Sequence, residues 1–338
     1  MSLPTWYHIV ILPISFVITY ILSKVVIYVC TRAGIVAVDV HKLNKPLIPT
    51  LGGLAILGGF LIPTSLLITS ANYRLRSIVI ISTALASSII GLYDDFKALK
   101  GLTKALLTIL LVIPIIIGHL LNPKIIPLGR PVVPIVGRLR LTIIYWLLLP
   151  LAIAGPANVI NMLEVFNGVM PITTSLCLTS LTLVSLLRGK IEVLPFTLAL
   201  LGSLLGYYPY NKYPSRLFTG NVGSLMVGSI IGCIAVMGGL EFVTLIALMP
   251  HLLNAFLVIS SVKGLRERRT IGSRPIVIRN DGLLEANKDP KAPYTLTRLI
   301  LFIAGPLTEK EIVTVLTWLE VVASILATVS GILYPPGV

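Results

Sequence analysis

The chain has 338 residues, of which 56% are hydrophobic and only 12% are charged. Soluble domains carry about 25% charged residues and lack repeated apolar runs of about 20 residues, so a soluble globular protein is excluded. The formal net charge is +14. Without a soluble domain to hold a nucleic-acid site, we assign this excess to loops that face anionic lipid headgroups or phosphorylated substrates.

Apolar runs long enough to cross a bilayer recur along the chain and predict an all-α polytopic membrane protein with about ten transmembrane helices. The first run has no basic leader and is too long for a signal-peptide core, so we expect it to be retained. The predicted spans are 6–29, 51–69, 76–93, 103–121, 141–156, 169–187, 191–209, 221–239, 241–262 and 312–333. The eighth and ninth nearly merge, so a count of nine or eleven stays open. We expect one integral membrane domain over residues 1–338.

Positively charged residues divide unevenly between the two sets of loops. Most Lys and Arg residues fall in the segments 30–50, 94–104, 210–220 and 263–311. Because cytoplasmic loops carry an excess of Lys and Arg, these four segments are predicted to be cytoplasmic. The even span count then places both termini outside, in a plasma-membrane or endoplasmic-reticulum-type membrane.

Two loops carry β-hairpin signals. Short β-branched runs between Gly and Pro residues predict a small hairpin at 124–140, in an outer loop. A second hairpin is predicted at 276–285 on the cytoplasmic side, where Asp281-Gly282 forms a turn signal between apolar runs.

Polar side chains gather at the ends of spans, all on the side predicted to be cytoplasmic. In the segment 39–53, Lys45 is a candidate phosphate donor, and Gly52-Gly53 permits close approach of the backbone. A basic loop that opens a helix is the simpler interpretation of this segment.

Two adjacent carboxylates, Asp94 and Asp95, close the third predicted span and are followed by Lys97, Lys100 and Lys104. Charges flanked by hydrocarbon are expensive, and two close carboxylates suit a divalent cation or a phosphate held through one. A nearby ammonium would neutralise the remaining phosphate charge. The alternative is a solvated charge run beside the membrane, but the adjacent pair favours a functional site.

A third polar cluster follows the fifth predicted span. Spacing of three places Asn158, Asn161 and Glu164 near one face of a helix, with Asn167 further round. Amide oxygens can ligate a hard cation, and amides can read the edge of a nucleobase. Hydrogen bonding between helices is the alternative, although four polar residues at this spacing exceed what packing needs.

Two further regions carry weaker signals. Gly220-Asn221 precedes a predicted span, and glycines before a helix expose N–H groups suited to an anion, although this is also an ordinary turn. The basic loop that contains Arg268, Arg269 and Arg274 is a candidate phosphate clamp, with charge that orients the chain in the membrane as the equal alternative.

His251 and Asn254 lie in the inner half of the ninth predicted span. Both are candidates for substrate contact, although structural hydrogen bonding within the bundle is their more ordinary role. Glu320, in the last predicted span, is interpreted as a helix-packing partner.

These motifs, in this order, resemble the polyprenyl-phosphate N-acetylhexosamine-1-phosphate transferases (glycosyltransferase family 4). The resemblance covers most of the chain and is closest to the eukaryotic and archaeal branch, the dolichyl-phosphate N-acetylglucosamine-1-phosphate transferases. The matching segments are Gly91-Leu92-Tyr93-Asp94-Asp95 with Lys104, Asn158-x-x-Asn161 with Asn167-Gly168, Tyr213-Pro214-Ser215-Arg216-x-Phe218-x-Gly220, Pro250-His251 with Asn254, Ile278 to Glu285, and Gly305-Pro306-Leu307.

The resemblance implies ten transmembrane helices with a cytoplasmic site. It also implies transfer of a sugar-1-phosphate from a UDP-sugar, by default UDP-N-acetylglucosamine, to dolichyl or polyprenyl phosphate. UMP would be released, and a lipid-linked oligosaccharide for protein N-glycosylation would be started. Mg²⁺ or Mn²⁺ would be required as the cofactor.

Residue roles are carried over by position from the same resemblance. Lys104 would contact the pyrophosphate, Asn161 would help to hold the metal, and Asn167 would read the uracil. Asp94 or Asp95 would orient or deprotonate the lipid phosphate. The arginine loop would cover the sugar and the diphosphate.

One position departs from the family pattern. Asn221 stands where the family has an Asp that ligates the metal. An amide oxygen can still ligate, but the lost charge attraction at ~4 Å is worth about 4 kcal/mol at an effective dielectric of roughly 20. We hypothesise that Glu164 restores this charge, so that Asp95, Asn161, Glu164 and Asn221 form the metal site.

Other functions stay open at this point. Asn221 raises the alternative of a paralogue that binds nucleotide-sugar or lipid without turnover, or that scaffolds an active partner. A transporter would place ionisable groups near the middle of broken helices, whereas here they gather at one surface. The sugar, the lipid length, the metal and the oligomeric state, a homodimer included, are not fixed by the sequence.

Overall fold

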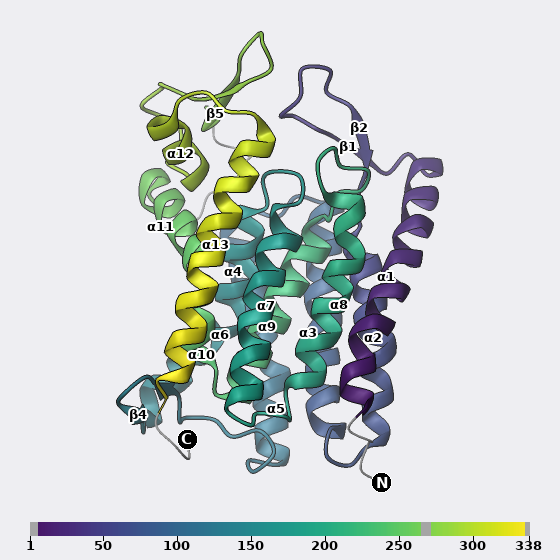
Figure 1. Ribbon diagram of the computed structural model, residues 1–338, viewed down its shortest axis with the longest axis vertical. Coiled ribbons are helices and arrows are strands. Elements are labelled where there is room, and N and C mark those ends of the chain that lie inside the picture. The colour runs from purple at the N-terminus through teal and green to yellow at the C-terminus, as the bar shows by residue number, and fades with distance from the viewer. Residues whose placement is uncertain (1–5, 265–271, 335–338) are drawn as a thin grey trace.

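The computed structural model describes residues 6–264 and 272–334. Long helices run side by side along the longest axis and form a bundle, with short strands at its ends (Figure 1). In chain order the helices are α1 (Trp6–Arg32), α2 (Gly53–Leu66), η1 (Leu67–Thr69), α3 (Arg74–Phe96), α4 (Gly101–Ile109), η2 (Leu110–Val112), α5 (Ile113–Leu121), α6 (Thr142–Leu163), α7 (Val169–Leu187), α8 (Leu194–Asn211), α9 (Asn221–Gly238), α10 (Glu241–Ala247), α11 (Met249–Val262), α12 (Leu296–Ala304) and α13 (Glu309–Ile332). The strands are β1 (Val36–Val38), β2 (Leu47–Pro49), β3 (Val132–Val133), β4 (Gly137–Arg138), β5 (Ile276–Ile278) and β6 (Leu284–Ala286).

The predicted all-α membrane fold is confirmed. In the described part of the chain, seven helices are long and apolar enough to cross a membrane, and α10 with α11, which meet at a bend of 69°, would add an eighth if the pair makes one span. The other two predicted spans, 51–69 and 191–209, form α2 with η1 and α8, which do not meet the same test. The predicted count of about ten is therefore approximate, while each predicted segment coincides with a helix or a run of helices. The short helix α12 was not predicted.

Small residues allow neighbouring helices to approach closely, as is common in membrane proteins. A Cβ atom on Gly202 would lie 2.2 Å from the carbonyl oxygen of Leu12, and one on Gly206 would lie 2.3 Å from that of Phe16. No side chain larger than a hydrogen fits at either position. The Gly202 and Gly206 pair, one helical turn apart, therefore sets the contact between α8 and α1.

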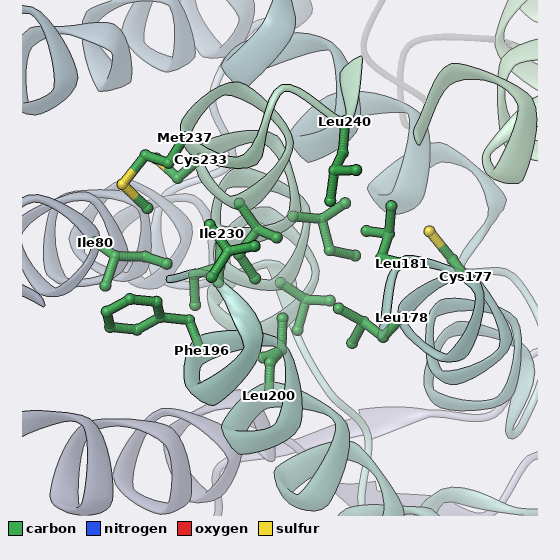
Figure 2. Close-up of a cluster of buried hydrophobic side chains, with 14 of the residues drawn as sticks. Ile80, Cys177, Leu178, Leu181, Phe196, Leu200, Ile230, Cys233, Met237 and Leu240 are labelled. Atoms are coloured by element: carbon green, nitrogen blue, oxygen red, sulfur yellow. The ribbon is translucent and has the colours of Figure 1, made fainter. Parts of the chain in front are cut away.

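Helix α9 lies at the centre of the bundle. Of its residues, 94% are buried, which is a far larger share than in the outer helix α1. Figure 2 shows Ile230 of α9 within a cluster that includes Phe196 and Leu200 of α8 and Leu178 of α7. Because neighbours pack against α9 on several sides, its first residue, Asn221, is held in a fixed position.

The loops sort to two ends of the bundle (Figure 1). One end carries β1, β2, β5 and α12, and the other carries β4 and both chain termini. We call the first the polar end, formed by the segments 33–52, 97–100, 212–220 and 272–308. The same four regions were grouped from their Lys and Arg content.

Both predicted hairpins are present as two-stranded antiparallel sheets. β3 pairs with β4 inside the predicted segment 124–140, and β5 pairs with β6 with Ile278 opposite Leu284. A third hairpin, β1 with β2, was not predicted. Its strands are only three residues long, which leaves little periodicity to detect.

A buried contact between a histidine and a glutamate lies inside the apolar part of the bundle. Nδ1 of His251, on α11, lies 3.4 Å from Oε2 of Glu320, on α13. Nε2 of the same ring lies 3.1 Å from Oγ1 of Thr173, on α7. The side chains of His251 and Glu320 are 1% and 0% exposed, so each needs the other to offset the cost of burial in an apolar medium. Glu320 is thus a helix-packing partner, as predicted.

Removing one partner of this pair should destabilise the protein. Glu320→Ala is expected to lower the free energy of unfolding by about 3 kcal/mol, because Nδ1 of the buried His251 ring loses its partner. Thermal denaturation of the detergent-solubilised protein measures the loss. Val322→Ala, at an exposed position of the same helix, serves as the control and should change stability by less than about 0.5 kcal/mol. Equal melting temperatures for the two variants would contradict the assignment.

Candidate active site

Side chains from four separate segments meet at the polar end. Asp94 and Asp95 lie in the last turn of α3, and Lys104 lies on α4. Asn161 lies near the end of α6, and Asn221 is the first residue of α9. The sequence predicted that these residues converge, and direct contacts join them.

The ammonium group of Lys104 is the centre of the cluster. Its Nζ lies 2.8 Å from Oδ2 of Asp94 and donates hydrogen bonds to Oδ1 of Asn161 and Oδ1 of Asn221, each at 2.8 Å. Three oxygens from three different helices therefore face one point. The positive charge of Lys104 offsets the negative charge of Asp94, which is only 5% exposed.

Asp95 binds the N-terminal end of α9. Its Oδ1 accepts hydrogen bonds from the backbone N–H of Asn221 at 2.8 Å and from Nδ2 of Asn221 at 2.9 Å, and its Oδ2 accepts from the N–H of Val222 at 3.1 Å. A carboxylate at this end of a helix satisfies free N–H groups and interacts favourably with the helix dipole. Asp95 therefore ties α3 to α9.

Asn161 connects α6 to the same place. Its Nδ2 donates to Oδ1 of Asn221 and to Oγ of Ser224, both at 2.7 Å. These donors fix the orientation of the Asn161 amide, so its Oδ1 faces Lys104. Asn221, in turn, presents its oxygen to Lys104 and Asn161 and its nitrogen to Asp95.

Glu164 directly follows α6 and stands beside this cluster. Burial raises the pKa of its carboxyl group to about 7, although hydrogen bonds from the Thr219 and Ser224 side chains act in the opposite direction. Asp95 raises this pKa further and Lys104 lowers it, so both lie close enough to interact electrostatically. Near neutral pH, the Glu164 carboxyl group is therefore divided between its protonated and charged forms.

The donor set fits a hard divalent cation. The side-chain oxygens of Asn161 and Asn221, with the neighbouring Glu164 carboxyl group, are amide and carboxylate oxygens, the ligand types that such cations take in proteins. Within residues 6–264 and 272–334, no group of three or more His, Cys, Asp or Glu side chains could hold a metal. Two of the three candidate ligands here are asparagine amides. A cation site built from them does not require three His, Cys, Asp or Glu side chains.

Asn167 belongs to a second polar cluster. Its Nδ2 donates to Oδ2 of Asp39 at 3.2 Å, and its backbone N–H donates to Oε1 of Glu309 at 2.9 Å. Lys42 pairs with Asp39 and lies 3.4 Å from Oε2 of Glu309. This cluster joins the β1–β2 hairpin to the start of α7 and the start of α13. In the predicted basic segment, Lys42 reaches these partners, whereas Lys45 is exposed between β1 and β2.

Three predicted substrate-binding residues make contacts within the protein. Asn158 donates to Oγ1 of Thr108 at 2.7 Å and so ties α6 to α4. Asn254 donates to the carbonyl oxygen of Met162 at 3.2 Å, and its Oδ1 accepts from the N–H of Leu296 at 3.0 Å. His251 is the buried partner of Glu320 described above. Their roles toward a substrate stay predictions that these contacts do not support.

The arginine loop is described only in part. Arg274 is exposed just before β5, and its carbonyl oxygen accepts from Nδ2 of Asn287 at 2.7 Å. Arg268 and Arg269 lie outside the described residues. The predicted phosphate clamp therefore stays a prediction.

Sequence reasoning missed several members of the two clusters. Ser224 lies three residues after Asn221, and this helical spacing could have pointed to it. Thr219 and Glu309 carry no such signal, because their partners come from distant parts of the chain.

Comparison with known proteins identifies the family. Residues 77–239 match the model described as glycosyl transferase family 4. A Sulfolobus acidocaldarius protein named "Putative UDP-N-acetylglucosamine--dolichyl-phosphate N-acetylglucosaminephosphotransferase" is 30% identical over 333 residues, which cover 94% of each chain. A Saccharolobus solfataricus protein of the same name is 28% identical, over 95% of this chain and 96% of its own. A phospho-N-acetylmuramoyl-pentapeptide-transferase of Clostridium novyi is 30% identical over 70% of this chain and 74% of its own.

Gly91 allows α3 to approach α9 closely enough for the Asp95 contact. A Cβ atom at Gly91 would lie 2.5 Å from the carbonyl oxygen of Asn221 and 2.6 Å from Cα of Val222. Gly91→Ala should therefore displace the start of α9 by a few tenths of an ångström or more. Because a shift of about 1 Å can cost about 100-fold in rate, we expect turnover to fall by 10- to 100-fold, roughly.

The matched control is Gly155→Ala on α6, where a Cβ atom would meet nothing within 4 Å. Its turnover should equal that of the unmodified protein. Initial rates of both variants, with folding checked by size-exclusion chromatography, measure the difference. Equal rates would show that close helix approach at Gly91 does not position the site.

Proposed function

The chain belongs to glycosyl transferase family 4, and from this premise we propose that it transfers N-acetylglucosamine-1-phosphate, or a related sugar-1-phosphate, from a UDP-sugar to dolichyl or polyprenyl phosphate. UMP leaves, and a lipid-linked oligosaccharide for protein N-glycosylation is started. The names of the two archaeal relatives support this substrate pair. The observation that carries the proposal is the convergence of Lys104, Asn161 and Asn221 at one end of the bundle.

In this reaction an oxygen of the lipid phosphate attacks the phosphorus that bears the sugar. The bond from that phosphorus to the oxygen of UMP breaks, so catalysis depends on positioning and charge neutralisation. Lys104 is placed to neutralise the diphosphate. Its move from Asp94 toward the substrate would free Oδ2 of Asp94 to accept the proton of the lipid phosphate.

The contacts of the two adjacent carboxylates support different roles for them in this proposal. Asp95 has both oxygens bonded to N–H groups of α9 and so acts as a positioning residue. Asp94 keeps Oδ1 on the N–H of Leu99 at 2.7 Å, while Oδ2 lies 2.8 Å from the Lys104 ammonium. We therefore assign the role of proton acceptor to the Asp94 carboxylate.

Asn161, Asn221 and Glu164 would hold Mg²⁺ or Mn²⁺, with Asp95 behind Asn221. The bound ion supplies charge neutralisation to the diphosphate. The polar end carries the Lys-rich and Arg-rich loops, which supports placing it, and the site, on the cytoplasmic side with both termini outside.

Turnover by the purified protein tests this function. With polyprenyl phosphate, UDP-N-acetylglucosamine and Mg²⁺, we expect UMP and the lipid-linked pyrophosphoryl sugar in equal amounts, and a chelator should stop both. Lys104→Met should lower the rate by about 100-fold or more, because the neutralising charge is lost. No product with any of a panel of UDP-sugars would contradict the proposal.

The presence of Asn221 supports a second candidate function, binding of a substrate without turnover. With an amide in place of a carboxylate, and with that amide bonded to Lys104, Asn161 and Asp95, the site can hold together without a metal. A protein that binds UDP-sugar or lipid without turnover would fit this observation. Binding of a UDP-sugar in calorimetry, with no UMP released, would identify it.

If Glu164 supplies the charge that Asn221 lacks, removing the Glu164 carboxylate should greatly reduce turnover, and a carboxylate at position 221 should restore it. Glu164→Gln is expected to reduce metal-dependent turnover by about 100-fold or more, since an attraction of about 4 kcal/mol at an effective dielectric of roughly 20 is lost. Asn221→Asp in the same background should restore it. Rates across a Mg²⁺ titration measure both effects.

The pH dependence provides the internal control. Because the pKa of Glu164 is about 7 and a ligand must be deprotonated, less Mg²⁺ should be needed for half-maximal rate at pH 8 than at pH 6. Glu164→Gln should remove this dependence. Unchanged activity in Glu164→Gln would rule out the compensation.

A further inference from the structure

A groove of about 540 Å³ opens on the outside of the bundle at the polar end. Lys24 and Ile27 of α1 line one side, and Leu47 and Ile48 of β2 line another. Ser215 and Arg216, in the loop between α8 and α9, complete it. None of the residues assigned above to the reaction lines this groove.

Each of the two cations that line the groove lies over a tyrosine ring, and the two rings contact each other. Nζ of Lys24 lies 5.0 Å from the ring centroid of Tyr20, and Cζ of Arg216 lies 5.1 Å from that of Tyr210. The two rings are themselves 5.1 Å apart. Cation–π contacts of this kind orient a charge without neutralising it.

Neither cation has an anionic partner. Within residues 6–264 and 272–334, no carboxylate lies in salt-bridge range of Lys24 or Arg216. Arg216 donates one hydrogen bond, from Nη2 to the carbonyl oxygen of Pro209 at 3.2 Å, and its remaining N–H groups can face a ligand. Two positive charges that line one groove without a counter-charge in this part of the chain favour an anion there.

The position of Lys24 indicates what kind of anion this is. Lys24 lies eight residues before the end of α1, about 12 Å along the helix axis. The neighbouring side chains Ile21, Val25 and Tyr28 are exposed on this apolar helix, so they face lipid. A charge at that depth is stabilised when its side chain extends to the phosphate layer of the membrane.

We propose that this groove binds the phosphate of an anionic membrane phospholipid between Lys24 and Arg216, with the acyl chains along the exposed face of α1. A polyprenyl phosphate offers similar chemistry, but the phosphate of a carrier substrate has to reach the reacting centre. The groove contains no residue of that centre, which favours a resident phospholipid.

Native mass spectrometry of the full chain, with added dioleoyl phosphatidylglycerol or dioleoyl phosphatidylcholine, tests the proposal. The unmodified protein should retain phosphatidylglycerol in preference. Since each basic side chain at the membrane surface contributes about fivefold in affinity, Lys24→Gln with Arg216→Gln should weaken phosphatidylglycerol binding by roughly 25-fold. Phosphatidylcholine binding should not change.

Arg32→Gln is the matched control, because Cζ of Arg32 lies 4.5 Å from the ring centroid of Tyr28 on the same helix but does not line the groove. It should keep the preference for phosphatidylglycerol, as should Lys24→Arg with Arg216→Lys. Equal losses of phosphatidylglycerol binding in Arg32→Gln and in the double Gln variant would show that general surface charge causes the effect. That result would overturn the proposed site. Displacement of phosphatidylglycerol from the groove by equimolar polyprenyl phosphate would overturn the choice of a phospholipid.

Discussion

The contact between the Asp95 carboxylate and the N-terminal end of α9 is the interaction on which the geometry of the site depends. Gly220, just before this helix, has φ +74°, and a Cβ atom there would lie 2.7 Å from Oδ2 of Asp95. Only glycine combines this backbone conformation with such a close carboxylate. With α9 buried by its neighbours and its first N–H groups bonded to Asp95, Asn221 has one position, and Asn161 and Lys104 are arranged around it.

Hydropathy and charge could predict the membrane spans of this protein and the side on which its polar residues gather, but not the contacts between individual side chains. The spans were predictable because a bilayer requires long apolar helices. The convergence of Asp95, Asn161 and Asn221 was also predictable, since each stands at a span end on the side rich in Lys and Arg. In each case the signal is local in the sequence, and membrane topology brings the separate segments to one end.

Pairwise contacts between distant segments could not be predicted in the same way. The segment 39–53 offered two lysines of equal appearance, and only the hairpin turn decides that Lys42 faces Glu309 while Lys45 faces solvent. His251 was a candidate for substrate contact because of its depth in a span. Its actual partner, Glu320, comes from a helix 69 residues later, and the 69° bend between α10 and α11 brings α11 into its place.

The asparagine at position 221 affects how the site is held together as well as the charge of the site. An Asp there would set a second carboxylate against Asp95, and like charges at hydrogen-bond distance repel unless a cation lies between them. The Asn221 amide instead donates from Nδ2 to Asp95 while its Oδ1 accepts from Lys104. The cluster in this chain is therefore satisfied by its own groups. In the proposed metal-dependent reaction, the charge that Asn221 does not supply would come from Glu164, whose carboxyl group beside this cluster has a pKa of about 7.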